Sequence, residues 1–334
     1  MMREGNSPSQ DFAELSHRAG KTMDVILHIG AHRTASTSFQ FYMRENAREL
    51  AAEGVGFWGP LRTRNGVLTG VVPVPGGLRP RKQMKLAKGR IQIHCERAEV
   101  NGIKQLIVSD ENMIGSLRQS VRDVALYQGA GERMARFAEA FDGRISRVCL
   151  SIRSYDSFWS SALAFAVGRG NKVPNAGRLA GFLANRRGWR DVITDVACAV
   201  PGADIMVLPY ESFGGRAERK LELMLEERID APMKSARVWM NRGPQLAELR
   251  RIVADRGGDP ALLPEGEGRY NPFDASQIAA LREAYADDLF WLTAGADGLA
   301  RLITENGRMK DGETPRTAGQ ERGQDNDQQK GRVA

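Results

Sequence analysis

One stretch near the start of the chain, residues 25–38, limits the fold more than any other part of the sequence. It has the sequence VILHIGAHRTASTS, which is an apolar run typical of a buried strand, a glycine turn, and a hydroxyl-rich segment that opens a helix. A loop leading from a strand into a helix leaves backbone N–H groups unpaired, and these groups and the positive end of the helix dipole point at one place. The stretch therefore predicts a site for a phosphate or sulfate group.

The side chains of this loop favour an anion held without magnesium. Arg33 adds a fixed positive charge, and Thr34, Ser36 and Thr37 add short hydroxyl donors. The Walker loop of nucleotide triphosphatases needs a lysine directly before the serine or threonine that holds magnesium. Here the cation comes earlier, and Ala35 stands where a glycine would be expected. We therefore expect no metal at this loop.

A second strand-to-helix junction carries a similar arrangement. The apolar run 147–152 predicts a strand that Arg153 closes, and Ser161 follows eight positions later in a predicted helix. A serine two turns into that helix lies near enough to share one anion with the arginine. The structural alternative for Arg153 is an ion pair with Asp156, three positions on.

Between and beyond these junctions, strand patterns alternate with helical patterns. Strands are predicted at 25–29, 54–58, 105–109, 147–152 and 204–210, and helices at 37–52, 131–141, 155–167, 179–200 (in two pieces around Gly188), 217–228, 244–254 and 275–292. This alternation predicts an α/β fold with three layers, in which a parallel sheet has helices on both faces. Ligands then gather at the carboxyl ends of the strands, where Gly30, Asp110 and Arg153 lie.

The 334 residues fit one large domain between two polar ends. We expect a disordered segment at 1–22, a single α/β domain at 23–305 and a disordered tail at 306–334. Residues 60–104 are expected to form a basic, loop-rich insertion, because they include the glycine- and proline-rich run 71–80.

The insertion holds much of the chain's basic charge, and the net charge of the whole chain is +7. Its basic residues are Arg62, Arg64, Arg79, Arg81, Lys82, Lys85, Lys88, Arg90, Arg97 and Lys104. Two interpretations stay open: a solvated surface, or a binding edge for an anionic acceptor or for the donor. Nucleic-acid binding is not expected, because no recognised nucleic-acid module accompanies the charge.

The cysteines and the first residues bear on the compartment. The three cysteines, at 95, 149 and 198, have the spacing of neither a disulfide framework nor a zinc site. Residues 1–23 contain no continuous apolar stretch, so neither a secretory signal nor a transmembrane segment is expected. We expect a cytoplasmic protein.

Both junctions resemble motifs of the sulfotransferase family. The 5′-phosphosulfate loop of that family typically has the pattern Gly-x-x-Lys-Thr-Gly-Thr-Thr after the first strand. This chain matches it at Gly30, Thr34, Ser36 and Thr37. Arg33 stands for the lysine and Ala35 for the second glycine.

The family's second signature is an arginine at the end of a later strand and a serine eight positions on, as Arg153 and Ser161 are here. The resemblance covers roughly residues 23–295, and between the motifs it depends on pattern rather than identity. Two anion motifs in this order are much more specific than either alone.

The resemblance implies a P-loop nucleotide-binding fold and a metal-free reaction. The sulfuryl group of 3′-phosphoadenosine 5′-phosphosulfate would pass to a hydroxyl, or less often to an amine. Gly30 and residues 33–37 would bind the 5′ end of the donor, and Arg153 with Ser161 would bind the 3′-phosphate. Arg242 lies where some family members bring a loop over the nucleotide. Arg33 would stabilise the leaving oxygen by charge alone, because a guanidinium is a poor proton donor.

Glu111 is the leading general base, because Ser109–Asn112 looks like the Glu-bearing segment of the glycan-modifying branch of the family. Asp110 and His32 are the alternatives, and either carboxylate could instead cap the following helix. His28, inside the first strand, is expected to be a core residue. The same resemblance implies that the acceptor is a carbohydrate or glycolipid. If residues 60–90 line the acceptor pocket, we expect the acceptor to carry negative charge before the reaction.

Other functions stay open. A metal-dependent kinase would share the fold, and a non-catalytic nucleotide-binding or scaffold protein would account for Arg33 and Ala35. A basic nucleic-acid binder would lose affinity steeply with salt.

Overall fold

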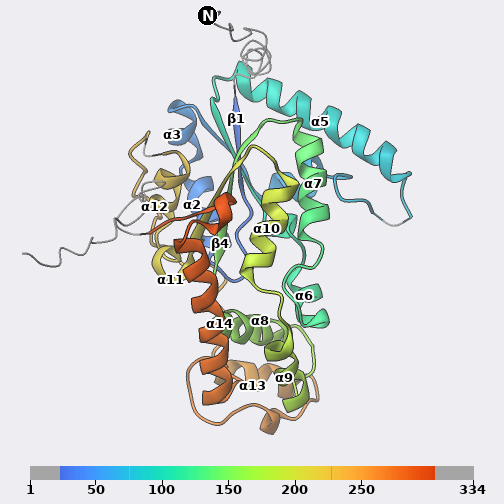
Figure 1. Ribbon diagram of the computed structural model, residues 1–334, viewed down its shortest axis with the longest axis vertical. Helices are drawn as coiled ribbons and strands as arrows, with labels where there is room; N and C mark the ends of the chain where they lie inside the picture. The colour runs from blue at the N-terminus through green and yellow to red at the C-terminus, as the bar shows by residue number, and fades with distance from the viewer. Residues whose placement is uncertain (1–22, 75, 227, 305–334) are drawn as a thin grey trace, which may run out of the picture.

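A sheet of six parallel strands forms the centre of the protein, as a computed structural model of residues 23–74, 76–226 and 228–304 describes it (Figure 1). The strands are β1 (Asp24–His28), β2 (Val55–Trp58), β3 (Gln105–Ser109), β4 (Ile145–Ile152), β5 (Asp204–Pro209) and β6 (Arg301–Leu302). Their order is β2-β3-β1-β4-β5-β6, and every pairing is parallel. The α/β fold predicted from the sequence is confirmed. The segments 1–22 and 306–334 lie outside the described residues.

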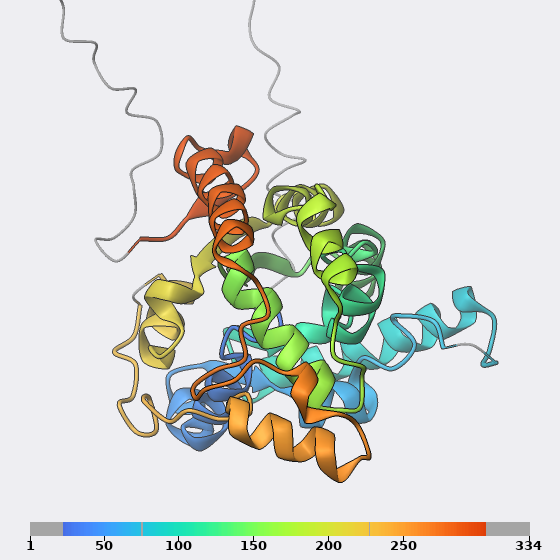
Figure 2. The same ribbon diagram turned by 90° about the horizontal axis from the view of Figure 1, so that it is seen from below.

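Helices cover both faces of this sheet. Their bounds are α2 (Ser36–Glu45), α3 (Ala47–Ala52), α4 (Pro60–Arg62), α5 (Pro80–Val100), α6 (Leu117–Asp123), α7 (Ala130–Phe141), α8 (Tyr155–Gly168), α9 (Ala176–Ala184), α10 (Trp189–Ala199), α11 (Tyr210–Phe213), α12 (Ala217–Met224), α13 (Leu246–Asp255) and α14 (Ala275–Thr293). Helices α2, α3, α11 and α12 share one core with the sheet, and α5, α7, α10 and α14 share the other (Figure 1). Helices α8, α9 and α13 lie beyond the carboxyl ends of the strands (Figures 1 and 2).

The central strand β1 shows why the sequence forms a doubly covered sheet. Val25 and Leu27 pack into the core with α7 and α10, while Ile26 packs into the core with α2 and α12. All three are at most 1% exposed. Each contributes about 1.5–3 kcal/mol of burial free energy. A strand buried on both faces is continuously apolar, and the sequence had that pattern.

The strand order places the loop after β1 between two neighbours. The chain leaves β1 and passes β3 on one side and β4 on the other, which is the topological switch point where α/β folds bind ligands. The N–H groups of Ile29 and Ala31 donate to the carbonyls of Cys149 and Ser151 on β4, both at 3.0 Å. These bonds hold the loop against the end of β4.

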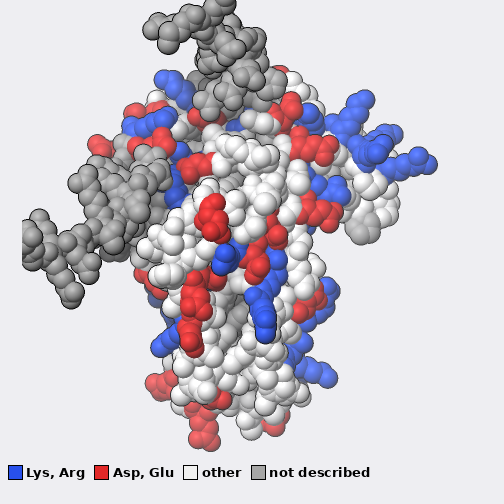
Figure 3. Space-filling view, in the orientation of Figure 1, with Lys and Arg blue, Asp and Glu red and all other residues white. Residues whose placement is uncertain are grey.

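The segment 60–104 differs from the expected loop-rich insertion. Residues 80–100 form one long helix, α5, which extends away from the rest of the molecule (Figures 1 and 2). Lys and Arg side chains gather along its outer part, as Figure 3 shows. Only the turns between α4 and α5 fit the expectation. Within the described residues, no helix has the length and apolarity needed to cross a membrane.

Candidate functional site

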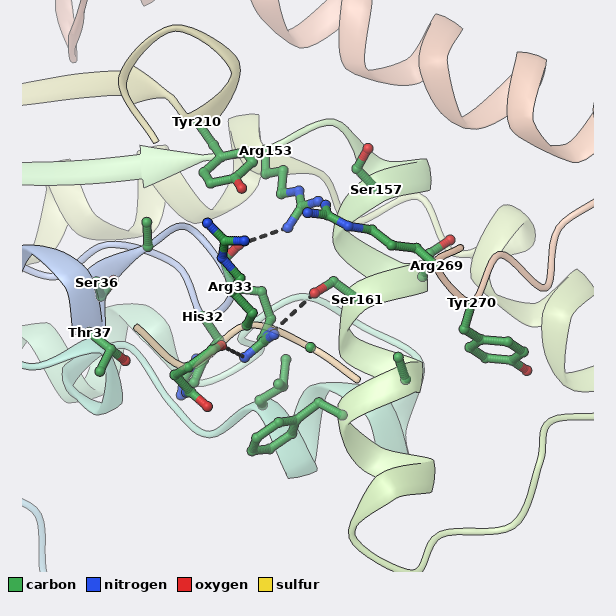
Figure 4. Close-up of a pocket in the computed structure, with 18 of the residues that line it drawn as sticks. His32, Arg33, Ser36, Thr37, Arg153, Ser157, Ser161, Tyr210, Arg269 and Tyr270 are labelled. Carbon is green, nitrogen blue, oxygen red and sulfur yellow. Dashed lines mark hydrogen bonds between the residues drawn. The ribbon is translucent and has the colours of Figure 1, made fainter. Parts of the chain in front are cut away.

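A cavity of about 360 Å³ opens at the carboxyl ends of β1 and β4 (Figure 4). Its walls come from the loop after β1, the first three turns of α8, and the segments 239–244 and 269–271. Four elements distant in sequence therefore meet around one space, as the switch-point rule leads one to expect.

The loop after β1 has an unusual backbone. Arg33 and Ala35 both adopt left-handed conformations, with φ of 66° and 64°. A non-glycine residue there costs about 1–2 kcal/mol, and such strain is concentrated at functional sites. Left-handed residues at a loop turn successive N–H groups toward one side, which forms an anion-binding concavity. The loop thus has the backbone form of an anion site.

Gly30 lies beneath this loop and lines no part of the cavity. A Cβ atom at Gly30 would lie 3.0 Å from Oγ of Ser36 and 3.2 Å from Nε2 of His28. Such a contact is tighter than side chains normally make, so a larger residue at position 30 would push against Ser36 and His28.

The two anion motifs predicted from the sequence meet directly. Nη1 of Arg153 donates to the backbone carbonyl of Arg33 at 2.9 Å, and Nε of Arg33 donates to Oγ of Ser161 at 3.0 Å (Figure 4). The guanidinium of Arg153 also stacks on the ring of Tyr210 at 4.4 Å. Arg153 and Ser161 therefore both contact Arg33 in the wall of one cavity. The alternative pairing is not seen, because Asp156 accepts from Arg282 at 2.9 Å instead.

The cavity is strongly cationic. Four arginines in its wall have no ion-pair partner among the described residues: Arg33, Arg153, Arg242 and Arg269. Burial lowers the pKa of Arg33, and the nearby charge of Arg153 lowers it further. Burial lowers the pKa of Arg153 as well. Each shift means that charging these groups costs free energy, and a bound anion offsets that cost.

Two buried polar atoms of cavity-lining residues have no hydrogen-bond partner in the part of the chain that the structure describes: Nε of Arg153 and Oγ of Ser36. Arg153 is only 8% exposed and Ser36 only 5%. Buried donors without partners are rare, because each costs about 1–3 kcal/mol. Both atoms are suited to donate to an anion.

Most of the predicted site residues line this cavity. They are His32, Arg33, Ala35, Ser36, Thr37, Glu111, Arg153, Ser161 and Arg242, together with Ser157. Thr34 does not, and the expectation that its hydroxyl faces the ligand is wrong. Its side chain is fully buried, and Oγ1 donates to the carbonyl of Ala31 at 2.6 Å, which closes the turn.

The two candidate carboxylates have different surroundings. Asp110 is 5% exposed and accepts from Thr63 at 2.9 Å, from Arg64 at 2.6 Å and from the N–H of Asn112 at 3.0 Å. Asp110 therefore caps the turn and does not line the cavity. Glu111 lines the cavity, and its two oxygens accept from Gln40 at 2.9 Å and Arg64 at 3.1 Å.

His32 lies at the wall with both ring nitrogens engaged. Nδ1 lies 3.0 Å from the hydroxyl of Tyr127, and Nε2 lies 3.1 Å from the side-chain amide of Asn112. Burial lowers the pKa of His32, although the charge of Glu111 opposes the shift. Because both nitrogens of the His32 ring are engaged, the ring is better suited to position the loop than to act as the general base. His28 is a core residue, as expected, and burial lowers its pKa to about 3.

A second cavity, of about 740 Å³, adjoins the first. The two share His32, Thr37 and Glu111, and also residues of the segment 238–242. That segment crosses over the loop: the N–H of Met240 donates to Ser38 at 2.9 Å, and Arg33 donates to the carbonyl of Asn241 at 3.2 Å. The wall between the cavities thus contains the loop and the carboxylate.

The residues of the first cavity that were missed in the sequence include one whole segment. Arg269, Tyr270 and Asn271 come from the segment between α13 and α14. Arg269 and Tyr270 lie beside α8 in Figure 4, and Oγ of Ser160 on α8 donates to the side-chain oxygen of Asn271 at 3.1 Å. No periodic pattern marks this segment, so no signal in the sequence could have placed it there.

The comparisons with known proteins give no family. No protein-family model, no curated protein and no solved structure matches the chain. Among the described residues, no three His, Cys, Asp or Glu side chains are grouped so that they could hold a metal ion.

Proposed function

We propose that the protein is a sulfotransferase that moves the sulfuryl group of 3′-phosphoadenosine 5′-phosphosulfate to a hydroxyl of a carbohydrate or glycolipid, or less often to an amine. The observation that carries this proposal is the direct contact between the two anion motifs. Arg153 and Ser161 both hydrogen-bond to Arg33 across more than a hundred residues of sequence. They do so in a cavity where four of the lining arginines have no ion-pair partner among the described residues. A ligand with anionic groups at two ends fits such a site.

Different groups of the cavity wall would bind the two ends of the proposed donor. The N–H groups of the loop and the hydroxyls of Ser36 and Thr37 would bind the 5′-phosphosulfate. Arg153, with its unpartnered Nε, would bind the 3′-phosphate together with Ser157 and Ser161. The indole of Trp239, which is 40% exposed in the cavity wall, offers a face for the adenine ring.

The reaction needs one bond made and one broken. The acceptor oxygen attacks sulfur, and the bond between sulfur and the oxygen of the 5′-phosphate breaks, leaving its electron pair on that oxygen. The hydroxyl proton passes to the carboxylate of Glu111, which lies in the wall shared by the two cavities. Arg33 and the loop N–H groups stabilise the charge on the leaving phosphate oxygen. The products are a sulfate ester and adenosine 3′,5′-bisphosphate.

A second function, a non-catalytic nucleotide-binding protein of the same fold, is favoured by one observation. The guanidinium of Arg33 donates to Ser161 and to the carbonyl of Asn241, so it is already engaged away from the loop. Such a protein would bind adenosine 3′,5′-bisphosphate and transfer nothing.

Transfer of ³⁵S from the labelled donor to a panel of neutral and acidic oligosaccharides tests the proposal. The wild type is expected to label at least one acceptor. Replacing Glu111 by Gln is expected to lower kcat by about 10²–10⁴, while the affinity for adenosine 3′,5′-bisphosphate stays within twofold. Binding without transfer to any acceptor would favour the non-catalytic alternative. Binding of ATP with magnesium in preference to the bisphosphate would refute both.

A further inference from the structure

The second cavity is also cationic, and its positive charge comes from other arginines than those of the first cavity. Five arginines line it: Arg44, Arg62, Arg64, Arg118 and Arg169. Arg64 is neutralised by Asp110 and Glu111, and among the described residues none of the other four has an ion-pair partner. Glu111 is the one carboxylate in the wall, as far as the structure describes the chain. The cavity therefore has a large excess of positive charge.

Three of these arginines lie over aromatic rings. The guanidinium of Arg44 lies over Phe41 at 5.4 Å, that of Arg62 over Trp58 at 4.7 Å, and that of Arg169 over Phe165 at 4.6 Å. Such contacts restrict where the guanidinium lies, while the N–H groups at its edge can still bind a ligand. A planar, pre-oriented guanidinium suits the bidentate binding of a carboxylate or sulfate.

Three arginines of the cavity also keep all their donors free. The side chains of Arg44, Arg118 and Arg169 donate no hydrogen bond to any described residue, and all three are exposed. A structural role would show bonds to carbonyls, as Arg178 makes to Val121 at 2.5 Å and Arg250 to Pro264 at 2.7 Å elsewhere in the protein. Their donors are instead available at the cavity.

We propose that this cavity binds the acceptor, and that the acceptor is an acidic carbohydrate, which carries carboxylate or sulfate groups besides the hydroxyl that reacts. This inference rests on the proposed function for the identity of the reaction. The reacting hydroxyl would lie at the wall shared with the first cavity, beside Glu111, and the anionic groups would lie against Arg118 and Arg169. The volume of about 740 Å³ lies within the range of small-molecule sites.

The basic residues of α5 take no part in this cavity. Of the ten basic residues between 60 and 104, only Arg62 and Arg64 line it, and the others lie on α5 or near its ends. The long helix thus provides basic residues that match the proposed contacts in charge and exposure but lie elsewhere.

Matched oligosaccharides test the inference. The probes are a tetrasaccharide of alternating glucuronate and N-acetylglucosamine and its carboxyl-reduced, neutral counterpart, titrated calorimetrically with and without adenosine 3′,5′-bisphosphate. We expect the acidic form to bind at least tenfold more tightly. The double variant Arg118→Ala/Arg169→Ala is expected to remove most of this difference, because each charge-assisted contact contributes about tenfold or more. The control, Arg81→Ala/Lys85→Ala on α5, lowers the net charge equally and should keep the difference.

Equal binding of the two tetrasaccharides, or an equal loss in the control variant, would overturn the inference. Tighter binding of a DNA oligonucleotide than of the acidic tetrasaccharide would overturn it too. The affinity for adenosine 3′,5′-bisphosphate is measured separately on the same proteins. If that nucleotide fails to bind, the proposed function fails, and the comparison of the two sugars without nucleotide still decides whether the cavity selects acidic carbohydrate.

Discussion

Replacing Arg153 by Ala gives the sharpest test of the donor site, because the proposed ligand has matching fragments. Adenosine 3′,5′-bisphosphate carries both phosphates, whereas 5′-AMP lacks the one assigned to Arg153. If Arg153 binds the 3′-phosphate, the variant should lose affinity for the bisphosphate and keep its affinity for 5′-AMP. The two ligands and two proteins form a thermodynamic cycle, and its coupling free energy reports this single contact.

The size of the effect follows from the surroundings of Arg153. The side chain is 8% exposed and its Nε has no hydrogen-bond partner among the described residues, so a contact with a dianionic phosphate would be made in a largely dehydrated place. A hydrogen bond to a charged group contributes about 1.5–3 kcal/mol. The wild type should therefore prefer the bisphosphate over 5′-AMP by about 10- to 150-fold, and in the variant the preference should fall to within about threefold.

The substitution also changes the apo protein, so its stability must be measured. Arg153 donates to the carbonyl of Arg33 and stacks on Tyr210. Losing both contacts should lower the free energy of unfolding by about 1–2 kcal/mol, which most domains tolerate. Isothermal titration at fixed salt gives the affinities, and urea unfolding gives the stability. Arg251→Ala, an exposed position on α13, is the control.

One result would refute the assignment. If the folded variant still prefers the bisphosphate over 5′-AMP as strongly as the wild type does, Arg153 does not contact the 3′-phosphate. The proposal would then have lost its second anion site.

Two further predictions concern buried titratable groups near the loop. Lys220, buried beneath the loop with Nζ 3.3 Å from the carbonyl of Thr34, has its pKa lowered by burial to about 8. Charging this side chain costs about 3 kcal/mol relative to water, so Lys220→Met should raise the free energy of unfolding by about 1–3 kcal/mol. The variant also loses a positive charge beneath the proposed anion site, so its affinity for the nucleotide should fall about threefold or more. Urea unfolding measures the stability and titration calorimetry the affinity, and a stabilised variant that binds the nucleotide as well as the wild type would contradict the electrostatic role. Burial lowers the pKa of His28 from 6.5 to about 3. Between these two pH values His28 is therefore protonated in the unfolded chain and neutral in the folded protein. Stability should therefore fall by about 2 kcal/mol between pH 7 and pH 5, and urea unfolding of His28→Gln at both pH values should show a clearly smaller loss.

The parts of the fold that the sequence predicted well are those in which one local pattern decides the structure. The runs at 25–29, 105–109 and 204–210 are apolar on both faces because both faces of their strands are buried, and all three form strands of the sheet. The helix predicted at 37–52 is divided at Asn46, whose side chain donates to the carbonyl of Tyr42. The strand ends then bring Gly30, Glu111 and Arg153 to one edge by topology alone.

Helix α5 was missed because its apolar stripe is narrow. Met84, Ala87, Ile91 and Cys95 are the buried apolar residues on it, spaced three and four apart as a helix requires. Leu86 and Ile93 are about half exposed, and basic side chains surround the stripe. The basic charge and the preceding glycine-rich run led to the prediction of a loop, although the helical spacing of these four residues was present in the sequence.

Side-chain direction within the loop lay beyond the sequence pattern. Thr34 and Thr37 match the same family motif equally well, yet Thr34 turns inward to the carbonyl of Ala31 and Thr37 lines both cavities. The left-handed conformation of Arg33 and Ala35 sets these directions. Because alanine and arginine seldom adopt the left-handed conformation, the sequence did not predict it at these two positions.

The strand order has a consequence for the proposed chemistry. Glu111 follows β3 and Arg153 follows β4, and β1 with its loop lies between these two strands. A donor held on the β4 side and an acceptor held on the β3 side would approach the loop from opposite directions. Displacement at sulfur needs the entering and leaving oxygens on opposite sides of the atom, which is the alignment that positioned groups supply. The central place of β1 would thus give one loop access to both proposed substrates. An acceptor cavity found on the β4 side would contradict this arrangement.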